Sequence, residues 1–208
     1  DGVPISGTTE CGPYEYVVAA PTTKTYYVAS PANGGNNAND GKTILSPWAD
    51  IAKVNTMMST MNPGDSIRFN CGDTFTIPNS TGYLRPVSGS AGLPITIGSY
   101  GTGAKPRITC AVPTDYLIFL NDKDYVNIDN LNFIDLVLNP ADKAAMCRIQ
   151  IAVSVDNSST NVNITNCDSS LVGTCFFLKG NYNSVISCNA NNIRMINNTP
   201  TNVNNDDD

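Results

Sequence analysis

The amino-acid sequence predicts an all-β solenoid, in which short parallel strands wind into a parallel β-helix that follows one α-helix. Three observations predict this class. Strand-like segments follow one another with Pro, Gly and Asn between them, and a helical period occurs only near the start. A seven-residue pattern recurs in Asn161–Cys167 and Tyr182–Cys188, 21 residues apart. Short strands that repeat at such a period are typical of coils stacked on one continuous core.

The helical period is predicted to span about residues 47–59. Ser46 suits the N-cap position and Pro47 the first helical turn. Apolar residues then follow near helical spacing, namely Trp48, Ile51, Ala52 and Met58. Open strand edges at the end of a solenoid would pair with other chains. We therefore expect this helix to cap the N-terminal mouth.

Strands are predicted wherever β-branched and aromatic residues alternate between turns. The predicted strands are Tyr26–Val28, Ser66–Asn70, Thr74–Ile77, Ile95–Tyr100, Arg107–Ala111, Tyr116–Leu120, Tyr125–Ile134, Arg148–Val155, Val162–Asn166, Phe176–Lys179 and Ser184–Asn189. Residues 1–24 are interpreted as an N-terminal extension and residues 25–208 as the β-helix. No pattern resembling a cap occurs near the polar end NVNNDDD. We therefore expect the solenoid to continue beyond Asp208.

The composition favours an extracellular location and excludes two classes of partner. Charged residues make up 14% of the chain, against about 25% in an average soluble protein, and neutral Asn takes their place. The net charge is −6 and the 12 basic residues are scattered, which argues against nucleic-acid binding. No apolar run is long enough to span a membrane. We expect a secreted or cell-surface protein.

The cysteine pattern favours disulfides over a metal site. The seven cysteines form no C-x-x-C pair, and the chain contains no His. Disulfides in an oxidising compartment are the better interpretation, and an odd count leaves one thiol over. Stacked parallel strands would bring Cys167 and Cys188 to neighbouring coils, at a separation compatible with a disulfide. An inward stack of two thiols is the alternative.

Four sequons are glycosylation candidates if the source is a eukaryote. Their acceptors are Asn79, Asn157, Asn163 and Asn197. We expect them on exposed turns. In a chain so rich in Asn, several sequons also arise by chance.

The stretch Tyr26–Ile108 carries short motifs in a fixed order. They are Tyr26-Tyr27-Val28, Asn39-Asp40-Gly41, Ser46-Pro47-Trp48, Pro63-Gly64-Asp65-Ser66, Gly72-Asp73-Thr74-Phe75, Gly92-Leu93-Pro94-Ile95 and Tyr100-Gly101-Thr102-Gly103. They resemble the N-terminal region of secreted right-handed parallel β-helix proteins, the pectate-lyase-like superfamily. The resemblance implies a right-handed β-helix with a cap helix. It leaves activity open, because lyases, glycoside hydrolases, epimerases, phage spikes and adhesins share this start.

A polysaccharide lyase of this kind needs a base, and often Ca²⁺ to acidify the proton that the base removes. The candidate bases are Lys123, Lys143, Arg148, Lys179 and Arg194. The candidate Ca²⁺ ligands are Asp129, Asp135, Asp156 and Asp168, with Asn39 and Asp40 as a further possibility in the first loop. These acids are spread singly, so turn or coil-edge carboxylates are the alternative, and the sequence assigns neither catalytic residues nor a metal site.

The sequence lacks the residues that other classes of enzyme require. A glycoside hydrolase needs paired carboxylates, and none are evident apart from the acidic terminus. The absence of His excludes a catalytic triad. Exposed tyrosines can stack on sugar rings, and the candidates are Tyr83, Tyr116, Tyr125 and Tyr182. The alternative for each is packing beneath a loop.

Two functions remain. The first is a secreted β-helix protein that acts on or binds an extracellular polysaccharide. The second is a non-enzymatic module of a glycosylated surface fibre, which would self-associate. Acids gathered with a Lys or Arg on one sheet face would favour the polysaccharide function. Head-to-tail contacts between copies of the chain would favour the fibre module.

Overall fold

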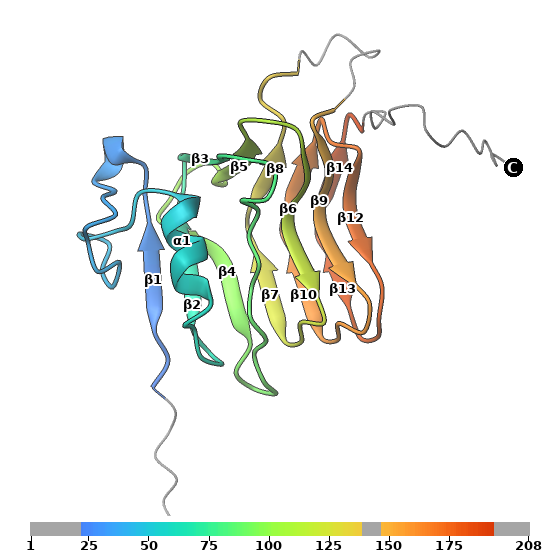
Figure 1. The fold of residues 1–208 in the computed structure, drawn as a ribbon, viewed down its shortest axis with the longest axis horizontal. Helices are drawn as coiled ribbons and strands as arrows, with labels where there is room; N and C mark the ends of the chain where they lie inside the picture. The colour runs from blue at the N-terminus through green and yellow to red at the C-terminus, as the bar shows by residue number, and fades with distance from the viewer. Residues whose placement is uncertain (1–21, 139–146, 194–208) are drawn as a thin grey trace, which may run out of the picture.

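The computed structural model describes residues 22–138 and 147–193, and it shows three parallel sheets that run side by side along one axis (Figure 1). The first sheet contains β1 (Thr25–Val28), β2 (Ser66–Asn70), β4 (Ile95–Tyr100), β7 (Val126–Asp129), β10 (Val162–Thr165) and β13 (Ser184–Ile186). The second contains β3 (Thr74–Ile77), β5 (Arg107–Cys110), β8 (Asn132–Ile134), β11 (Asp168–Ser170) and β14 (Asn189–Asn191). The third contains β6 (Thr114–Asn121), β9 (Ile149–Asp156) and β12 (Thr174–Leu178). The all-β parallel β-helix predicted from the sequence is confirmed.

The number of residues in a coil varies, whereas the repeated seven-residue pattern suggested a constant period of about 21 residues. Ser184 hydrogen-bonds to Asn163, 21 residues earlier, but Asn163 hydrogen-bonds to Asn127, 36 residues earlier. Both coils contain a strand of the third sheet, β9 in the longer coil and β12 in the shorter one, and the connection that precedes β9 is longer than the one that precedes β12. The repeat is therefore set by strand register, and the connections between strands absorb the differences in length.

The corners after the first sheet account for some of the Asn residues. Asn130, Asn166 and Ser187 follow paired strands and have φ of 55°, 51° and 55°. Asn adopts this left-handed backbone more readily than most residues other than Gly. The same corner splits the predicted strand Tyr125–Ile134 into β7 and β8, because the chain turns at Asn130.

The core is a set of stacked apolar side chains from successive coils. In the first sheet, Ile97 pairs with Ile128, and Val126 pairs with Val162. All four side chains have no exposed surface. Alternate residues of these strands therefore point inward, and the residues between them form the outer face.

The predicted helix is present as α1 (Ile51–Met58), but it begins later than expected. Asp50 is its N-cap and accepts a hydrogen bond from the Lys53 amide. Ser46 instead hydrogen-bonds to Asp40, and Trp48 forms a parallel bridge with Val28. The stretch before Asp50 is therefore held extended, which prevents a start at Pro47.

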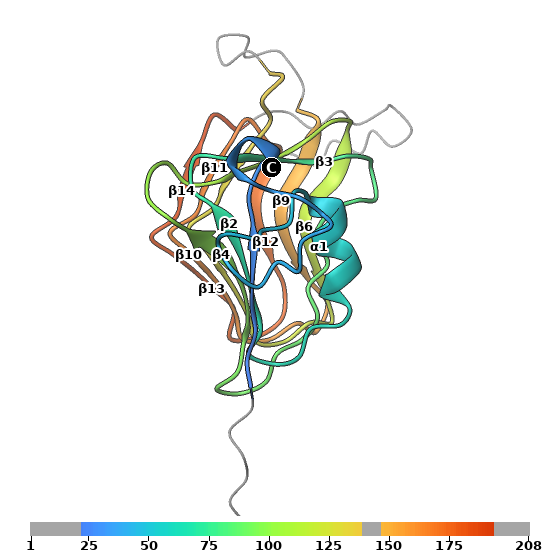
Figure 2. The same cartoon turned by 90° about the vertical axis from the view of Figure 1, so that its left-hand side faces the viewer.

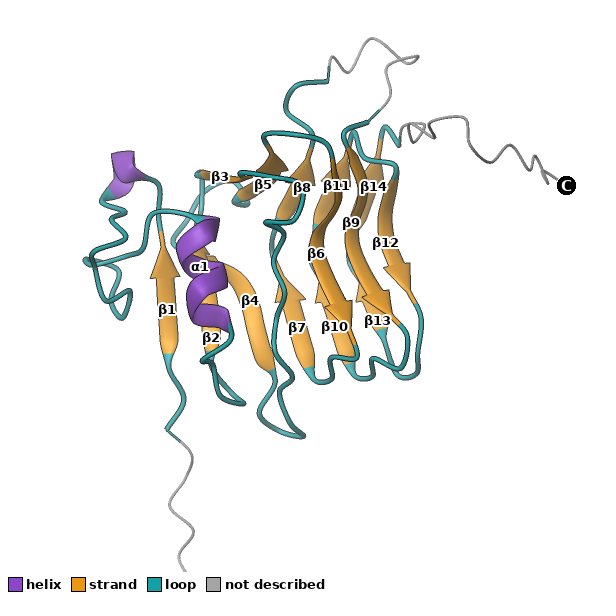
Figure 3. Cartoon of the chain, in the orientation of Figure 1, coloured by secondary structure: helices purple, strands orange, loops and turns teal. Residues whose placement is uncertain are grey.

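The helix α1 lies beside the first coil (Figure 2). Its buried residues Ile51, Val54 and Met58 join the core. The segment between β3 and β4 passes between α1 and β6 (Figure 3), where Leu84 bridges to Ile118. The helix thus continues the line of the third sheet, and its role as a cap stays a prediction. Among the described residues, no helix is long and apolar enough to cross a membrane.

Two acids of the N-terminal motifs tie this end together. Asp73 accepts hydrogen bonds from the Ser30 amide at 2.8 Å and hydroxyl at 2.9 Å, from Asn33 at 2.6 Å and from Asn70 at 3.0 Å. Asp65 accepts from the amides of Lys24 and Asn62. The motifs that carry the family resemblance therefore contain acids whose contacts build the start of the solenoid.

Candidate functional site

A row of amides and hydroxyls crosses the outer face of the first sheet. Strand register places Thr96 beside Asn127, Asn127 beside Asn163, and Asn163 beside Ser184. Asn163 Nδ2 donates to Asn127 Oδ1 at 3.1 Å, and Ser184 Oγ donates to Asn163 Oδ1 at 2.7 Å. These bonds orient the side chains in one direction, so the row is a fixed pattern of donors and acceptors.

A second row, two residues further along each strand, carries the charges. Arg68 pairs with Gly98 in register, and Asp129 pairs with Thr165. The Oδ1 atom of Asp129 accepts hydrogen bonds from Thr165 Oγ1 at 2.7 Å and Asn166 Nδ2 at 3.1 Å. Both bonds come from the following coil, which fixes the carboxylate on the outer face.

Gly98 makes room for the side chain of Arg68. A Cβ atom at Gly98 would stand 2.7 Å from Arg68 Nη1 and 3.2 Å from the Asp129 carbonyl oxygen. The guanidinium therefore lies across β4 toward β7. Within the part of the chain that the structure describes, Arg68 forms no ion pair.

The two rows line a shallow groove of about 420 Å³. Its lining residues are Arg68, Thr96, Asn127, Asp129, Asn163, Thr165 and Ile186. A groove of amides, hydroxyls, one carboxylate and one guanidinium can exchange several hydrogen bonds with a polyhydroxylated ligand. We refer to it as the first-sheet groove.

Sequence reasoning identified Asp129 but missed Arg68. The signal was present in the alternation Ile67-Arg68-Phe69, where two buried residues flank an outward one. The role of Gly98 depends on register between coils, and only the structure shows that register.

The four candidate Ca²⁺ ligands lie on different parts of the solenoid. Asp129 is on the first sheet, and Asp168 begins β11 of the second. Asp156 ends β9 and pairs with Lys179 at 3.1 Å, and Asp168 pairs with Lys105 at 2.9 Å. No cluster of three acids or cysteines occurs among residues 22–138 and 147–193. Calcium binding therefore stays a prediction without a defined set of ligands.

Asp135 and Arg148 form a buried structural pair. The Asp135 side chain has no exposed surface, and its Oδ1 lies 2.8 Å from Arg148 Nη2. Hydrogen bonding to Asp135 raises the pKa of Arg148. Arg148 also donates to the carbonyls of Ala111 and Cys110. A guanidinium so engaged is a poor base, so the geometry favours a structural role over a catalytic one.

The other candidate bases lie away from the first-sheet groove. Lys179 pairs with Asp156 at the end of the third sheet, and Lys123 lies beyond the end of β6. Lys143 and Arg194 lie outside the described residues.

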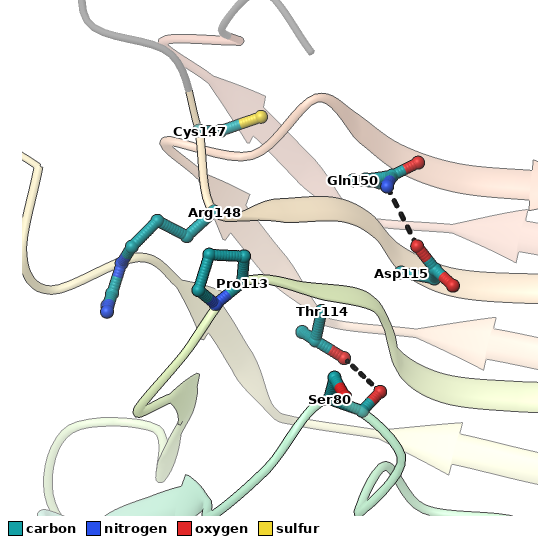
Figure 4. A pocket seen from close by; sticks show the side chains of 7 residues that line it. All are labelled: Ser80, Pro113, Thr114, Asp115, Cys147, Arg148 and Gln150. Carbon is teal, nitrogen blue, oxygen red and sulfur yellow. Dashed lines mark hydrogen bonds between the residues drawn. The ribbon is translucent and has the colours of Figure 1, made fainter. Parts of the chain in front are cut away.

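A small cavity of about 160 Å³ lies where β6 and β9 begin (Figure 4). Its polar groups already have partners, because Gln150 donates to Asp115 at 2.8 Å and Thr114 donates to the Ser80 carbonyl at 3.2 Å. Arg148 points away from Asp115 in this view. The cavity therefore offers a ligand fewer unpaired polar groups than the first-sheet groove does.

The tyrosine candidates separate into two pairs. Tyr83 and Tyr116 meet edge to face with ring centroids 5.3 Å apart, and Tyr116 stacks on Phe119 at 4.4 Å. Tyr125 and Tyr182 occupy left-handed corners before β7 and β13, with φ of 54° and 59°. Sugar stacking at these four residues stays a prediction.

The loop candidates Asn39 and Asp40 have ordinary turn partners. Asp40 Oδ1 accepts from the Lys42 amide and the Ser46 hydroxyl, and these bonds lower the pKa of its carboxyl. Asn39 Nδ2 donates to the Pro47 carbonyl.

Cys167 and Cys188 lie on neighbouring coils, as predicted. Cys188 Sγ is 3.3 Å from the amide nitrogen of Cys167, and both side chains are thiols in the structure. Their disulfide stays a prediction.

The sequon acceptors have different surroundings. Asn79 and Asn157 are exposed turn residues, as expected. Asn163 lies within β10 and belongs to the amide row, so the expectation of an exposed turn was wrong for this residue. Asn197 lies outside the described residues.

Comparisons with known proteins support the fold. No protein-family model matches this chain. The lacto-N-biosidase of Bifidobacterium longum subsp. longum is 38% identical over 77 residues, which are 37% of this chain and 5% of that protein. The GH136 lacto-N-biosidase from Eubacterium ramulus superposes with a TM-score of 0.56 at 23% identity, over 80% of this chain and 30% of the other.

Two lyases are also similar in structure. A rhamnogalacturonan lyase superposes with a TM-score of 0.61 at 19% identity, over 82% of this chain and 42% of the lyase. A pectate lyase superposes with a TM-score of 0.52 at 17% identity, over 82% of this chain and 48% of the lyase. These likenesses confirm the predicted fold class. The chain spans less than half the length of each protein compared.

Proposed function

We propose that this chain is part of a secreted β-helix protein that binds an extracellular glycan in the first-sheet groove. The amide row from Asn127 to Ser184 carries the proposal. Its hydrogen bonds hold donors and acceptors at the spacing of the coils, and a glycan repeats its hydroxyls along a line. Arg68 and Asp129, in the second row, add a charge of each sign to the same groove.

The relatives support a glycan as ligand. The matched stretch of 77 residues belongs to a lacto-N-biosidase, and the structural neighbours include two lyases named for polysaccharides. The fibre alternative has no comparable support. We propose binding rather than hydrolysis for this portion, because the described lining of the groove contains a single carboxylate and hydrolysis uses two.

Binding can be tested with three ligands: lacto-N-biose, a galacturonate oligosaccharide and a rhamnogalacturonan oligosaccharide. The readout is amide chemical-shift change in isotopically labelled protein. We expect at least one ligand to shift residues of β7 and β10, and Asn163→Leu and Arg68→Ala to weaken that binding. Thr76→Ala, an exposed residue of β3 on the second sheet, is the matched control. Binding that both groove variants leave unchanged would refute the proposal.

A further inference from the structure

A second pocket lies outside the first-sheet groove, between α1, the segment 81–87 and the turn after β6. Its volume is about 410 Å³, within the range of about 300–1,000 Å³ that is usual for small-molecule sites. Asn55 on α1 donates to the carbonyls of Gly82 and Tyr83, at 2.8 and 3.3 Å. These bonds attach the segment to the helix, so the walls of the pocket are fixed.

The charge of this pocket is opposite to that of the whole chain. Its lining residues are Asn55, Ser59, Thr81, Tyr83, Arg85, Pro86, Val87 and Lys123. They include two cations and no acid, although the chain has a net charge of −6. Neither Arg85 nor Lys123 belongs to an ion pair within the described residues.

Asp122 and Asp124 flank Lys123 in the sequence, and both accept hydrogen bonds from the following coil. Asp122 accepts from the Ser158 hydroxyl at 2.7 Å, and Asp124 accepts from Thr160. Asp115, beside the tyrosine pair, accepts from Gln150. These acids keep their charge, but none of them lines the pocket or forms an ion pair with Arg85 or Lys123 among the described residues.

Tyr83 positions one of these cations. The guanidinium carbon of Arg85 lies 4.3 Å from the centre of the Tyr83 ring, and its Nη2 donates to the Tyr83 hydroxyl. The Tyr83 ring also meets Tyr116 and Phe119 in edge-to-face contacts. Tyr83 thus supports Arg85, and its covered ring face is not available for stacking on a sugar.

We propose that this pocket binds the carboxylate of an acidic sugar residue. Arg85 and Lys123 would bind the carboxylate through charge-assisted hydrogen bonds. Ser59 and Thr81 would meet ring hydroxyls, and Pro86 and Val87 would pack on the C–H face of the ring. The lining consists of side chains and offers no open strand edge, which favours a sugar over an extended acidic peptide. The inference does not depend on the first-sheet groove.

Calorimetry with the full chain tests this site. The probes are trigalacturonate, its methyl ester and triglutamate. We expect trigalacturonate to bind. The methyl ester, which lacks the carboxylates, and triglutamate, which lacks the sugar rings, should each bind at least about tenfold more weakly. We expect Lys123→Gln and Arg85→Gln each to weaken trigalacturonate binding by about tenfold. Arg107→Gln, an exposed arginine of β5, is the matched control and should leave affinity unchanged.

Lys123→Gln is the decisive variant, because the Lys123 side chain has no described partner whose loss could unfold the chain. The proposal is refuted if the methyl ester binds as tightly as the acid, if triglutamate does, or if Lys123→Gln binds like the parent. Arg68→Ala separates the two sites. It should weaken binding in the first-sheet groove, and adding Lys123→Gln to it should still weaken trigalacturonate binding by the same factor as in the parent.

Discussion

The guanidinium of Arg68 lies over Gly98, the residue beside it in the next coil, where a Cβ atom would stand 2.7 Å from Nη1. The two residues are 30 positions apart in the sequence and neighbours on the sheet. A missing side chain on one coil thus permits a long side chain from the previous coil to lie across it and line the groove.

This relationship predicts the effect of Gly98→Ala. The added methyl group should displace Arg68, which is the flexible partner, and change the free energy of unfolding by no more than about 1 kcal/mol. Glycan affinity in the groove should fall about tenfold, as for the loss of one charge-assisted hydrogen bond. In an Arg68→Ala background the same substitution should have little further effect, which a double-mutant cycle measures. Additive losses would contradict the contact.

Breaking the buried pair of Asp135 and Arg148 should destabilise the fold. Arg148→Met leaves a carboxylate that has no exposed surface without its cation, a change that costs about 3–5 kcal/mol. Replacing both, as Asp135→Asn with Arg148→Met, should restore part of that loss. Urea unfolding measures both variants. Lys179→Gln, which removes a more exposed pair, is the control and should cost less than about 1 kcal/mol.

Asp73 should make stability depend on pH. Burial raises the pKa of this carboxyl, but hydrogen bonds from Ser30, Asn70 and Asn33 outweigh it and hold the pKa below 3.8. The folded state therefore favours the ionised form. That stabilisation is present above pH 3.8 and is lost as the pH falls through the lower folded value.

Asp73→Asn should lower the free energy of unfolding at pH 7 by about 1–3 kcal/mol. The variant should also lose less stability than the parent between pH 5 and pH 3, a range of about two units that includes the ordinary aspartate value. Urea titrations at the three pH values measure the effect. Equal acid sensitivity in the parent and the variant would assign the pH dependence to other carboxylates.

Oxidation should link Cys167 to Cys188. Burial raises the pKa of the Cys167 thiol to about 12, so very little thiolate is present at neutral pH. We expect the folded thiol form to oxidise slowly and oxidative refolding to form the bond faster. Mass spectrometry of peptides identifies the linkage. Two alkylated thiols after oxidative refolding, or a different partner for Cys188, would show that the alternative of stacked thiols is correct.

The fold could be inferred because each coil repeats local signals. Strand composition, turn residues and the cysteine spacing located most strands of the first sheet. The helix start was misplaced because Ser46 and Trp48 bond to Asp40 and Val28, and such partners are not visible in local sequence. The site was harder to infer for the same reason. Asp129 could be suggested as an isolated acid, but its neighbours come from other coils.

The sequence by itself determined the class of fold, the order of its strands and the Asn-rich corners, because these depend on periodicity and on backbone preferences of single residues. The tertiary structure decided which outward residues share a row. It placed Arg68 over Gly98 and in the same groove as Asp129, paired Asp135 with Arg148, and gathered Arg85 and Lys123 into one pocket. Coils of unequal length bring together residues at unequal spacings, so the period of the sequence does not reveal these contacts.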